Sequence, residues 1–216
     1  WISEQTNGVL KPDVSFQGNQ LLTLLNTIYF KDEWMDRFER RQTKPDAFYV
    51  SAQQTVQCDY MNRTYAMHPY TRGEGFTRSA LSLKNGGRMV FILPDQGVSV
   101  DTLLASPQKA ASLFLGVDQG TGKVVFQIPK FSFGSKLNLK KTLHAMGVRC
   151  AFESDQADFS GMTQDQAFFS QILQETHIAI DEKGVEAAAF TKLDYAGTAA
   201  PNEKEAYMIL NRPFLY

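Results

Sequence analysis

Few residues in this chain are of types that could carry out hydrolytic chemistry. The only candidates for a general base are His68, His144 and His177. A serine hydrolase also needs a nucleophile beside that base and an acid that orients it, and no G-x-S-x-G elbow is present. Ser160 lies in a Phe-Ser-Gly sequence with no histidine nearby. We therefore interpret the histidines as surface or core residues, and a triad that only the fold brings together remains the alternative.

Glycines and cysteines offer no site for a phosphate, a metal or a cofactor. Residues 116–123 (GVDQGTGK) lack the first glycine of a phosphate-binding loop, which is Val117 here, and Val124 replaces the hydroxyl residue that would hold magnesium. No histidine pair or acidic loop has the spacing of metal ligands, and the two cysteines form no CxxC motif. We predict no metal and no cofactor.

One tripeptide matches a modification signal. Asn62-Arg63-Thr64 fits the acceptor pattern for N-glycosylation. That modification requires a secreted eukaryotic context. We prefer to interpret the three residues as a turn.

The composition is that of an ordinary globular protein. The 216 residues include 22 Lys and Arg against 23 Asp and Glu, so the net charge of -1 does not attract the phosphates of a nucleic acid. Hydrophobic residues make up 43% of the chain, which is enough to form a core. No stretch approaches the roughly 20 apolar residues that cross a bilayer. We expect a folded protein that binds neither nucleic acid nor membrane.

The elements that must position any functional residue are mostly strands. Apolar and alternating runs predict strands at residues 21–30, 47–60, 65–70, 76–83, 88–93, 123–132 and 168–180. The first of these is apolar on both sides, as in a central strand that is covered on both faces. Residues 84–87 (KNGG) predict a tight hairpin turn between two of the strands.

Helices are a minority in this prediction. Residues 100–115 favour two short helices separated at Pro107, and residues 137–146 favour another that ends at Gly147. The strands and these helices together predict a strand-rich α+β fold in one domain.

Residues 181–195 (DEKGVEAAAFTKLDY) combine two conflicting signals. Their alanines and charged residues favour a helix, but their period-two alternation is that of a strand. One side carries small or apolar residues, namely Val185, Ala187, Ala189, Thr191, Leu193 and Tyr195. The other side is mostly polar, with Glu186, Ala188, Phe190, Lys192, Asp194 and Ala196.

The uncharged side allows this segment to enter a sheet. A charge on that side would be buried without a partner, at a cost of several kcal/mol. We therefore infer that the segment can slip between two existing strands, beginning at its Gly184 end. An alanine-rich surface helix followed by a linker is the alternative.

Motifs spread over the whole chain resemble those of the serpins. In the family's order they are residues 6–8 (TNG), 26–31 (NTIYFK) with Trp34, 89–94 (MVFILP), 129–131 (PKF), 157–162 (ADFSGM), 181–191 (DEKGVEAAAFT) and 210–214 (LNRPF). Any one of these motifs is a weak signal, but seven in order are specific.

The resemblance implies the serpin fold, an α+β fold with large mixed β-sheets, a minority of helices and an exposed reactive loop. It implies one partial serpin domain over residues 1–216, in which residues 182–210 form the hinge and the reactive-centre loop. The family's helical amino-terminal part and its last strand are expected to lie outside this sequence.

The resemblance also implies a suicide inhibitor of serine proteases. A protease would cleave the loop, form a covalent acyl complex, and be trapped when the loop inserts into the main sheet; the expected protein is a monomer, not an enzyme, and extracellular. A non-inhibitory serpin used as a carrier, chaperone or storage protein is the alternative. The uncharged inserting side of the hinge favours the inhibitor.

Carried over by motif, the resemblance implies roles for individual residues. Glu182 would start the hinge, Gly184 would be its pivot, and the first residues to insert would be Val185, Glu186, Ala187, Ala188 and Ala189. Asn26 and Gln174 would belong to the shutter under the sheet opening, and Trp34 to the breach at its top. The family's usual spacing puts the reactive bond at Thr198-Ala199. A small residue at that bond suits elastase-like or subtilisin-like proteases, with Ala196, Tyr195 and Lys192 as rival positions.

Overall fold

A computed structural model describes residues 2–6, 8–9, 24–28, 30–185 and 205–216. The chain divides into two compact units, one of residues 1–30 with 132–178 and one of residues 31–131 with 179–216. Each unit is described by itself below. A single domain over residues 1–216 stays a prediction. No helix within the described ranges is long and apolar enough to cross a membrane.

The second unit is built on a mixed sheet with the strand order β11-β7-β4-β5-β6, in which β3 also pairs with β4. These strands are β3 (Lys44–Tyr49), β4 (Thr55–Gly73), β5 (Phe76–Ser82), β6 (Arg88–Pro94), β7 (Gly120–Pro129) and β11 (Glu205–Ile209). The β11-β7 pair is parallel and the other pairs are antiparallel. The predicted strands at residues 47–60 and 65–70 were wrong in their bounds, because β4 runs unbroken through 19 residues.

Strand β7 explains how this sheet buries one face. Val124, Phe126 and Ile128 alternate along it and are fully buried, whereas the residues between them are partly exposed. This alternation is what a strand with one covered face requires. The prediction that the strand continues to residue 132 was wrong, since β7 ends at Pro129 and a new strand begins at Phe131.

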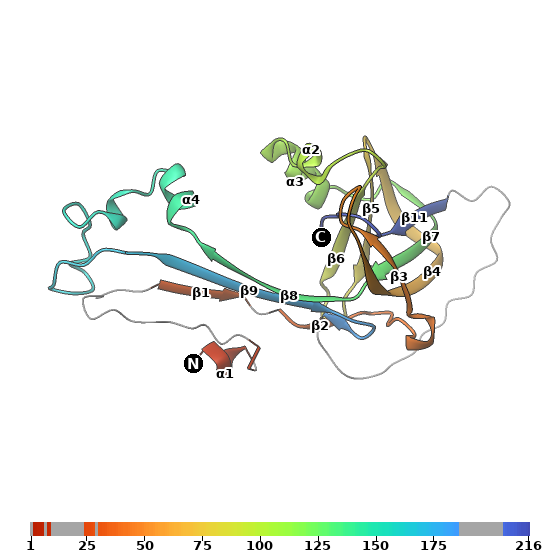
Figure 1. Ribbon diagram of the computed structural model, residues 1–216, viewed down its shortest axis with the longest axis horizontal. Coiled ribbons are helices and arrows are strands. Elements are labelled where there is room, and N and C mark those ends of the chain that lie inside the picture. Colours follow the sequence, from red (N-terminus) through yellow and green to blue (C-terminus); the bar gives the residue numbers. More distant parts are fainter. Residues whose placement is uncertain (1, 7, 10–23, 29, 186–204) are drawn as a thin grey trace. The chain divides into compact units, whose positions relative to one another are not determined.

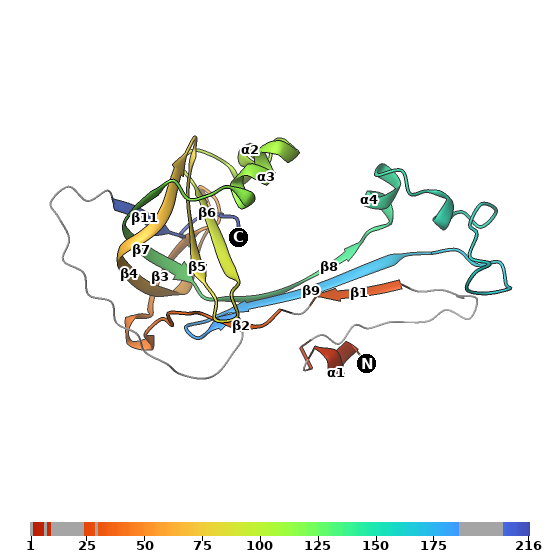
Figure 2. The same cartoon turned by 180° about the vertical axis from the view of Figure 1, so that it is seen from behind.

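The predicted hairpin and the helices after it are confirmed. Strands β5 and β6 pair in register across the turn, where Gly86 has a positive φ of 88°. Helices α2 (Val100–Leu103) and α3 (Pro107–Leu115) are separated as expected, with Pro107 in the first turn of the second. Leu103 and Leu113 pack with Ile92 of β6, and both views show the helices beside β5 and β6 (Figures 1 and 2).

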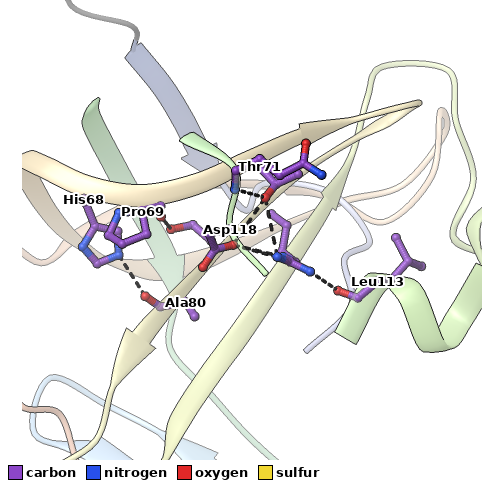
Figure 3. A network of polar contacts seen from close by, with 9 residues as sticks. His68, Pro69, Thr71, Ala80, Leu113 and Asp118 are labelled. Carbon is purple, nitrogen blue, oxygen red and sulfur yellow. Dashed lines mark hydrogen bonds and ion pairs between the residues drawn. The ribbon is translucent and has the colours of Figure 1, made fainter. Parts of the chain in front are cut away.

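A buried polar network ties α3 and the loop after it to the sheet (Figure 3). The Arg78 guanidinium forms an ion pair with Asp118 at 2.9 Å and donates to the Leu113 carbonyl at 3.1 Å. Thr71 accepts from the backbone N–H of Gln119. Nearby, the His68 Nε2 lies 2.8 Å from the Ala80 carbonyl, and burial lowers the pKa of this histidine. The network satisfies polar groups that would otherwise be costly to bury.

The first unit contains the strands β1 (Leu24–Ile28), β8 (Phe131–Asn138) and β9 (Ile172–Ile180), which extends into the second unit, and the short helices α1 (Ile2–Gln5) and α4 (Lys140–Ala145). Strand β9 pairs in parallel with β1 and also pairs with β8. Helix α4 is shorter than predicted because residues 137 and 138 belong to β8, but Gly147 does follow its end with a φ of 94°. The fold is strand-rich with few helices, as predicted.

The expectation that residues 21–30 form a strand covered on both faces is not met in the described part of the chain. Strand β1 spans Leu24–Ile28, and the side chains of Ile28 and Phe30 are about half exposed. Apolar side chains gain free energy when they are removed from water, so the faces of this strand still need cover. Within the described residues that cover is incomplete.

Candidate functional site

The segment predicted to be the hinge begins with a tight turn at the end of β9. The Asp181 N–H donates to the Gly184 carbonyl, and the Asp181 Oδ1 accepts from the N–H groups of Lys183 and Gly184 at 2.8 and 3.2 Å. Strand β10 (Gly184–Val185) then pairs antiparallel with β9, with Val185 opposite Ile180. The turn therefore sends the chain back along the strand it has just left.

Strand β10 is held on its other edge by β2 (Asp32–Glu33). Gly184 lies opposite Glu33 and Val185 opposite Asp32, and both β10 residues are buried. A side-chain Cβ at residue 184 would lie 2.4 Å from the Asp32 carbonyl oxygen and 2.5 Å from the Glu33 Cα. Only glycine allows this approach between the two backbones. The role of Gly184 as a pivot stays a prediction.

Glu182 is a buried carboxylate inside the turn, only 4% exposed. Its Oε1 accepts from the Thr43 hydroxyl at 2.8 Å and from the Lys130 Nζ at 3.1 Å, while its carbonyl oxygen accepts from the Phe38 N–H. Burial alone would raise the pKa of Glu182, but hydrogen bonds from its own N–H, Thr43 and Lys130 lower the pKa below its ordinary value of 4.5. The carboxylate is ionised at neutral pH and holds the turn in place, and its role as the start of the hinge stays a prediction.

Trp34 packs directly against this turn and is fully buried. Its indole Nε1 donates to the Asp181 carbonyl at 2.9 Å, and its backbone N–H donates to the Lys183 carbonyl at 3.0 Å. Its ring meets Phe38 edge-on, with the ring centroids 6.1 Å apart. The structure thus brings Trp34, Glu182 and Gly184 together, and the breach role of Trp34 stays a prediction.

The two predicted shutter residues face each other in the first unit. Asn26 of β1 and Gln174 of β9 are direct partners in the parallel register. Asn26 is exposed and Gln174 is partly buried in the described part of the chain. They form the middle pair of the β1-β9 register, and their role in the shutter stays a prediction.

The rest of the predicted site lies outside the described residues. This applies to Glu186, Ala187, Ala188 and Ala189 of the hinge and to the proposed reactive bond Thr198-Ala199. The sequence analysis missed Lys130 and Thr43 as partners of the hinge carboxylate. Lys130 lies in the PKF motif, and nothing else in the local sequence marks it as a partner of Glu182.

The tripeptide Asn62-Arg63-Thr64 was wrongly interpreted as a turn. It lies within β4, where the Asn62 Nδ2 donates to the carbonyls of Gln42 and Tyr60 at 2.9 and 3.0 Å. The bond to Gln42 joins β4 to the segment before β3, and the bond to Tyr60 lies within β4.

No hydrolase triad is assembled among the described residues. The Ser160 hydroxyl donates to Asp158, away from any histidine contact, and His144 packs edge-on against Phe152. His177 lies 3.3 Å from the Ser132 hydroxyl, but no carboxylate in the described ranges bonds to its ring to orient it. These ranges also contain no cluster of three potential metal ligands.

Removing the charge of Glu182 should destabilise the fold. We expect Glu182→Gln to lower the free energy of unfolding by about 1 to 2 kcal/mol, because Lys130 loses its buried anionic partner but remains partly hydrated. Glu39→Gln is the matched control, since its ion pair with Arg41 is exposed and worth about 0 to 1 kcal/mol. Urea denaturation of the three proteins measures the difference, and equal losses in both variants would contradict the role of Glu182.

The same carboxylate should make stability depend on acid pH. Because the pKa of Glu182 is lower in the folded protein than its ordinary 4.5, its contribution is complete above that value and is lost as the pH falls through the folded pKa. Glutamine does not titrate. The difference in melting temperature between wild type and Glu182→Gln should therefore be constant near neutral pH and shrink below about pH 4.5. A difference that stayed constant down to pH 3 would contradict this assignment.

Comparison with known proteins gives one family. The family model for serpins (serine protease inhibitors) matches residues 1–216. Human Serpin B13 is 28% identical over the whole chain, which covers 57% of that protein. An alpha-1-antitrypsin homolog of the carp Cyprinus carpio is 31% identical over the whole chain, again with 57% of that protein covered. The chain thus spans about half the length of these relatives.

Solved structures agree with this match. Human thyroxine-binding globulin in complex with thyroxine superposes with a TM-score of 0.82 at 25% identity, over 99% of this chain and 56% of that one. A serpin from the trematode Schistosoma haematobium gives a TM-score of 0.79 at 26% identity, over 99% of this chain and 55% of that one.

Proposed function

Since this chain belongs to the serpin family, a family of protease inhibitors and not of enzymes, we propose that it is part of a suicide inhibitor of serine proteases. The protease serine attacks the peptide carbonyl carbon of Thr198, the bond to the Ala199 nitrogen breaks, and an acyl-enzyme forms. The freed hinge side then inserts as a new strand and carries the bound protease with it. The proposed strand addition is of a kind that exposed sheet edges and seams allow.

The observation that carries this proposal is the antiparallel return of the chain at the hinge turn. With Val185 opposite Ile180, the same register continued toward the middle of β9 puts Ala187 opposite Ile178 and Ala189 opposite Thr176. Directly opposite residues of an antiparallel pair point to the same face. The small, uncharged side of the hinge would therefore share a face with Val185 and Ile180, which are both buried.

The polar side of the hinge would share the opposite face. On that face β9 carries Glu175, which pairs with Lys136 at 2.9 Å, and His177, which meets Ser132. In the continued register Glu186 would lie diagonal to His177, and Lys192 would lie diagonal to Glu175. The two faces of β9 thus match the two sides of the hinge segment.

Insertion would replace the hydrogen bonds between β1 and β9 with two new sets, one on each side of the inserted strand. The parallel register of β1 and β9, which places Asn26 opposite Gln174, would open along its five paired positions. The new strand would run antiparallel to both neighbours, and Thr191 would fall between Asn26 and Gln174. Each added ladder hydrogen bond contributes about 0.5 to 1.5 kcal/mol, so the gain grows with every residue inserted.

The residue at the reactive bond suggests the protease class. Thr198 offers a small side chain, which suits an elastase-like or subtilisin-like primary pocket. Ala196 would select the same class. Tyr195 or Lys192 at that position would select proteases that prefer a large aromatic or a basic residue.

A non-inhibitory serpin is the second candidate. Thyroxine-binding globulin, among the similar solved structures, is named for binding thyroxine, so membership of the fold does not imply inhibition. A protein of that kind has no need for an uncharged inserting side. The run of alanines from residue 187 to 189 therefore favours the inhibitor.

The deciding experiment uses the whole protein of which this chain is a part. It is mixed with pancreatic elastase, subtilisin and trypsin in turn, and the products are separated on a denaturing gel. We expect a complex with elastase or subtilisin that survives denaturation, and release of a peptide that begins at Ala199 by mass spectrometry. Cleavage without any stable complex, or cleaved protein that melts no higher than the intact form, would contradict the proposal.

A further inference from the structure

The turn between β5 and β6 contains an asparagine followed by a glycine, a pair with a chemistry of its own. Asn85 and Gly86 are both exposed, and Gly86 has a positive φ of 88°. A side-chain Cβ at residue 86 would meet nothing within 4 Å, so the glycine stands in open space. Its backbone N–H donates only a long hydrogen bond, at 3.3 Å, to the Leu83 carbonyl. The Gly86 nitrogen is therefore exposed and weakly held.

An asparagine in front of a glycine can lose ammonia without an enzyme. The Gly86 nitrogen gives up its proton and attacks the Asn85 side-chain carbonyl carbon, the bond from that carbon to Nδ2 breaks, and ammonia leaves with the proton. A cyclic imide remains, and water opens it at either of its two carbonyl carbons. The product at residue 85 is aspartate or isoaspartate, and no oxidant or cofactor takes part. Glycine is the most favourable second residue, because it has no Cβ to hinder the attack.

The Asn85 amide also has a structural role in the folded protein. Its Nδ2 donates to the Asp32 Oδ1 at 3.1 Å, and the Asn85 backbone N–H donates to the Asp32 Oδ2 at 3.3 Å. Asp32 belongs to β2 and is only 6% exposed. The Lys84 N–H adds a bond to the Glu33 carbonyl at 2.9 Å. These contacts fasten the turn to β2, and both views show this end of the hairpin beside β2 (Figures 1 and 2).

We propose that Asn85 is a site of spontaneous deamidation that separates this turn from β2. The product carboxylate replaces the amide donor with an acceptor that faces the Asp32 carboxylate across the 3.1 Å that the hydrogen bond now spans. Two carboxylates so close cannot both be ionised without a cost. The adjacent cation, Lys84, is already paired with the Glu33 carboxylate at 2.5 Å. Isoaspartate in addition lengthens the backbone of the turn by one carbon.

Strand β2 carries the change from this turn to the hinge turn. Its other side pairs with β10, where Gly184 lies opposite Glu33 and Val185 lies opposite Asp32. The same two residues of β2 therefore hold the hairpin on one side and β10 on the other. Deamidation loosens both contacts, and this consequence does not depend on whether the protein inhibits a protease.

The chemistry is tested by ageing the whole protein at mildly alkaline pH and mapping its peptides by mass spectrometry. We expect Asn85 to convert to aspartate and isoaspartate at least about tenfold faster than Asn62, which precedes an arginine and uses both amide hydrogens in hydrogen bonds. Asn7-Gly8 is the same dipeptide and serves as an internal reference, although Asn7 lies outside the described residues. Conversion of Asn7 without conversion of Asn85, or equal rates at Asn85 and Asn62, would overturn the proposal.

Variants test the structural consequence separately. Asn85→Asp is the direct product, and it should lower the melting temperature of the whole protein by about 2 to 4 °C. It should also speed hydrogen exchange at residues 32–34 and 184–185, because both sit on the loosened strand pair. Asn85→Ser is the matched control: its hydroxyl can still donate to Asp32 and it cannot deamidate, so it should melt close to the wild type and lose less stability on ageing.

A double variant identifies Asp32 as the source of the repulsion. Asp32→Asn combined with Asn85→Asp again places an amide opposite a carboxylate, and it should melt higher than Asn85→Asp alone. An Asn85→Asp protein that melts as high as the wild type, or a double variant with no recovery, would contradict the inference.

Discussion

Replacing Gly184 with alanine is expected to lower the free energy of unfolding by about 2 to 4 kcal/mol. The added methyl group would lie 2.4 Å from the Asp32 carbonyl oxygen, 2.5 Å from the Glu33 Cα and 2.9 Å from the Trp34 nitrogen. All three atoms belong to the backbone, so no side chain can rotate away. Strand β10 would have to separate from β2, and the hydrogen bond between the Trp34 N–H and the Lys183 carbonyl would weaken with it.

Gly161→Ala is the matched control for this prediction. A Cβ at residue 161 meets nothing within 4 Å, and the position is exposed. Alanine there should be neutral or stabilise slightly, by up to about 1 kcal/mol, through its effect on the unfolded chain. Chemical denaturation with tryptophan fluorescence follows the global transition and the surroundings of Trp34 together. Equal stability of the two variants would mean that the approach of β10 to β2 is looser than described.

Short sequence patterns were sufficient to predict the elements that depend on a few neighbouring residues. The KNGG turn and its flanking runs predicted β5 and β6, because a glycine with positive φ closes the hairpin within four residues. Pro107 predicted the break between α2 and α3, since proline fits the first turn of a helix but not its interior. These features depend on a few neighbouring residues and are visible in the sequence.

Strand bounds were predicted poorly where pairing sets them. Strand β4 runs on past the predicted break because β3, β7 and β5 pair with successive parts of it. The end of β7 and the start of β8 depend on a change of sheet around Lys130, which no propensity indicates. Long-range pairing of this kind overrides local preference.

The sequence singled out the glycine and the acid of the turn after β9 but not the residues that contact them, and the roles of both stay predictions. The hinge motif indicated Glu182 and Gly184. The contact between Glu182 and Lys130 joins residues 52 positions apart, and that between Trp34 and Asp181 joins residues 147 positions apart. A single sequence carries no pattern for such pairs, because any of the chain's other cations and carbonyls could have filled these places.

Arginine in place of Ala187 is expected to convert the whole protein from an inhibitor into a substrate. If the register of Val185 and Ile180 continues, residue 187 falls opposite Ile178 on the face that Val185 and Ile180 bury. An unpaired guanidinium there would oppose insertion by several kcal/mol. Insertion competes with hydrolysis of the acyl-enzyme, and each 1.4 kcal/mol added to the insertion barrier slows it about tenfold. The protease would therefore hydrolyse the acyl-enzyme and dissociate in its active form.

Ala188→Arg is the matched control, because residue 188 lies on the opposite, mostly polar side of the alternation. Its guanidinium would fall on the face that carries Glu175 and His177, beside polar groups and not beside the buried side chains of Val185 and Ile180. The measurement is the number of inhibitor molecules consumed per protease inactivated, read by titrating residual activity and by a denaturing gel. We expect a value near that of the wild type for Ala188→Arg and a value at least about tenfold higher for Ala187→Arg. Similar values for the two variants would show that the alternation of the hinge does not decide which side enters the sheet. If Ala187→Arg still inhibited the protease as well as the wild type does, insertion would not require an uncharged side, and the physical argument for insertion would be wrong.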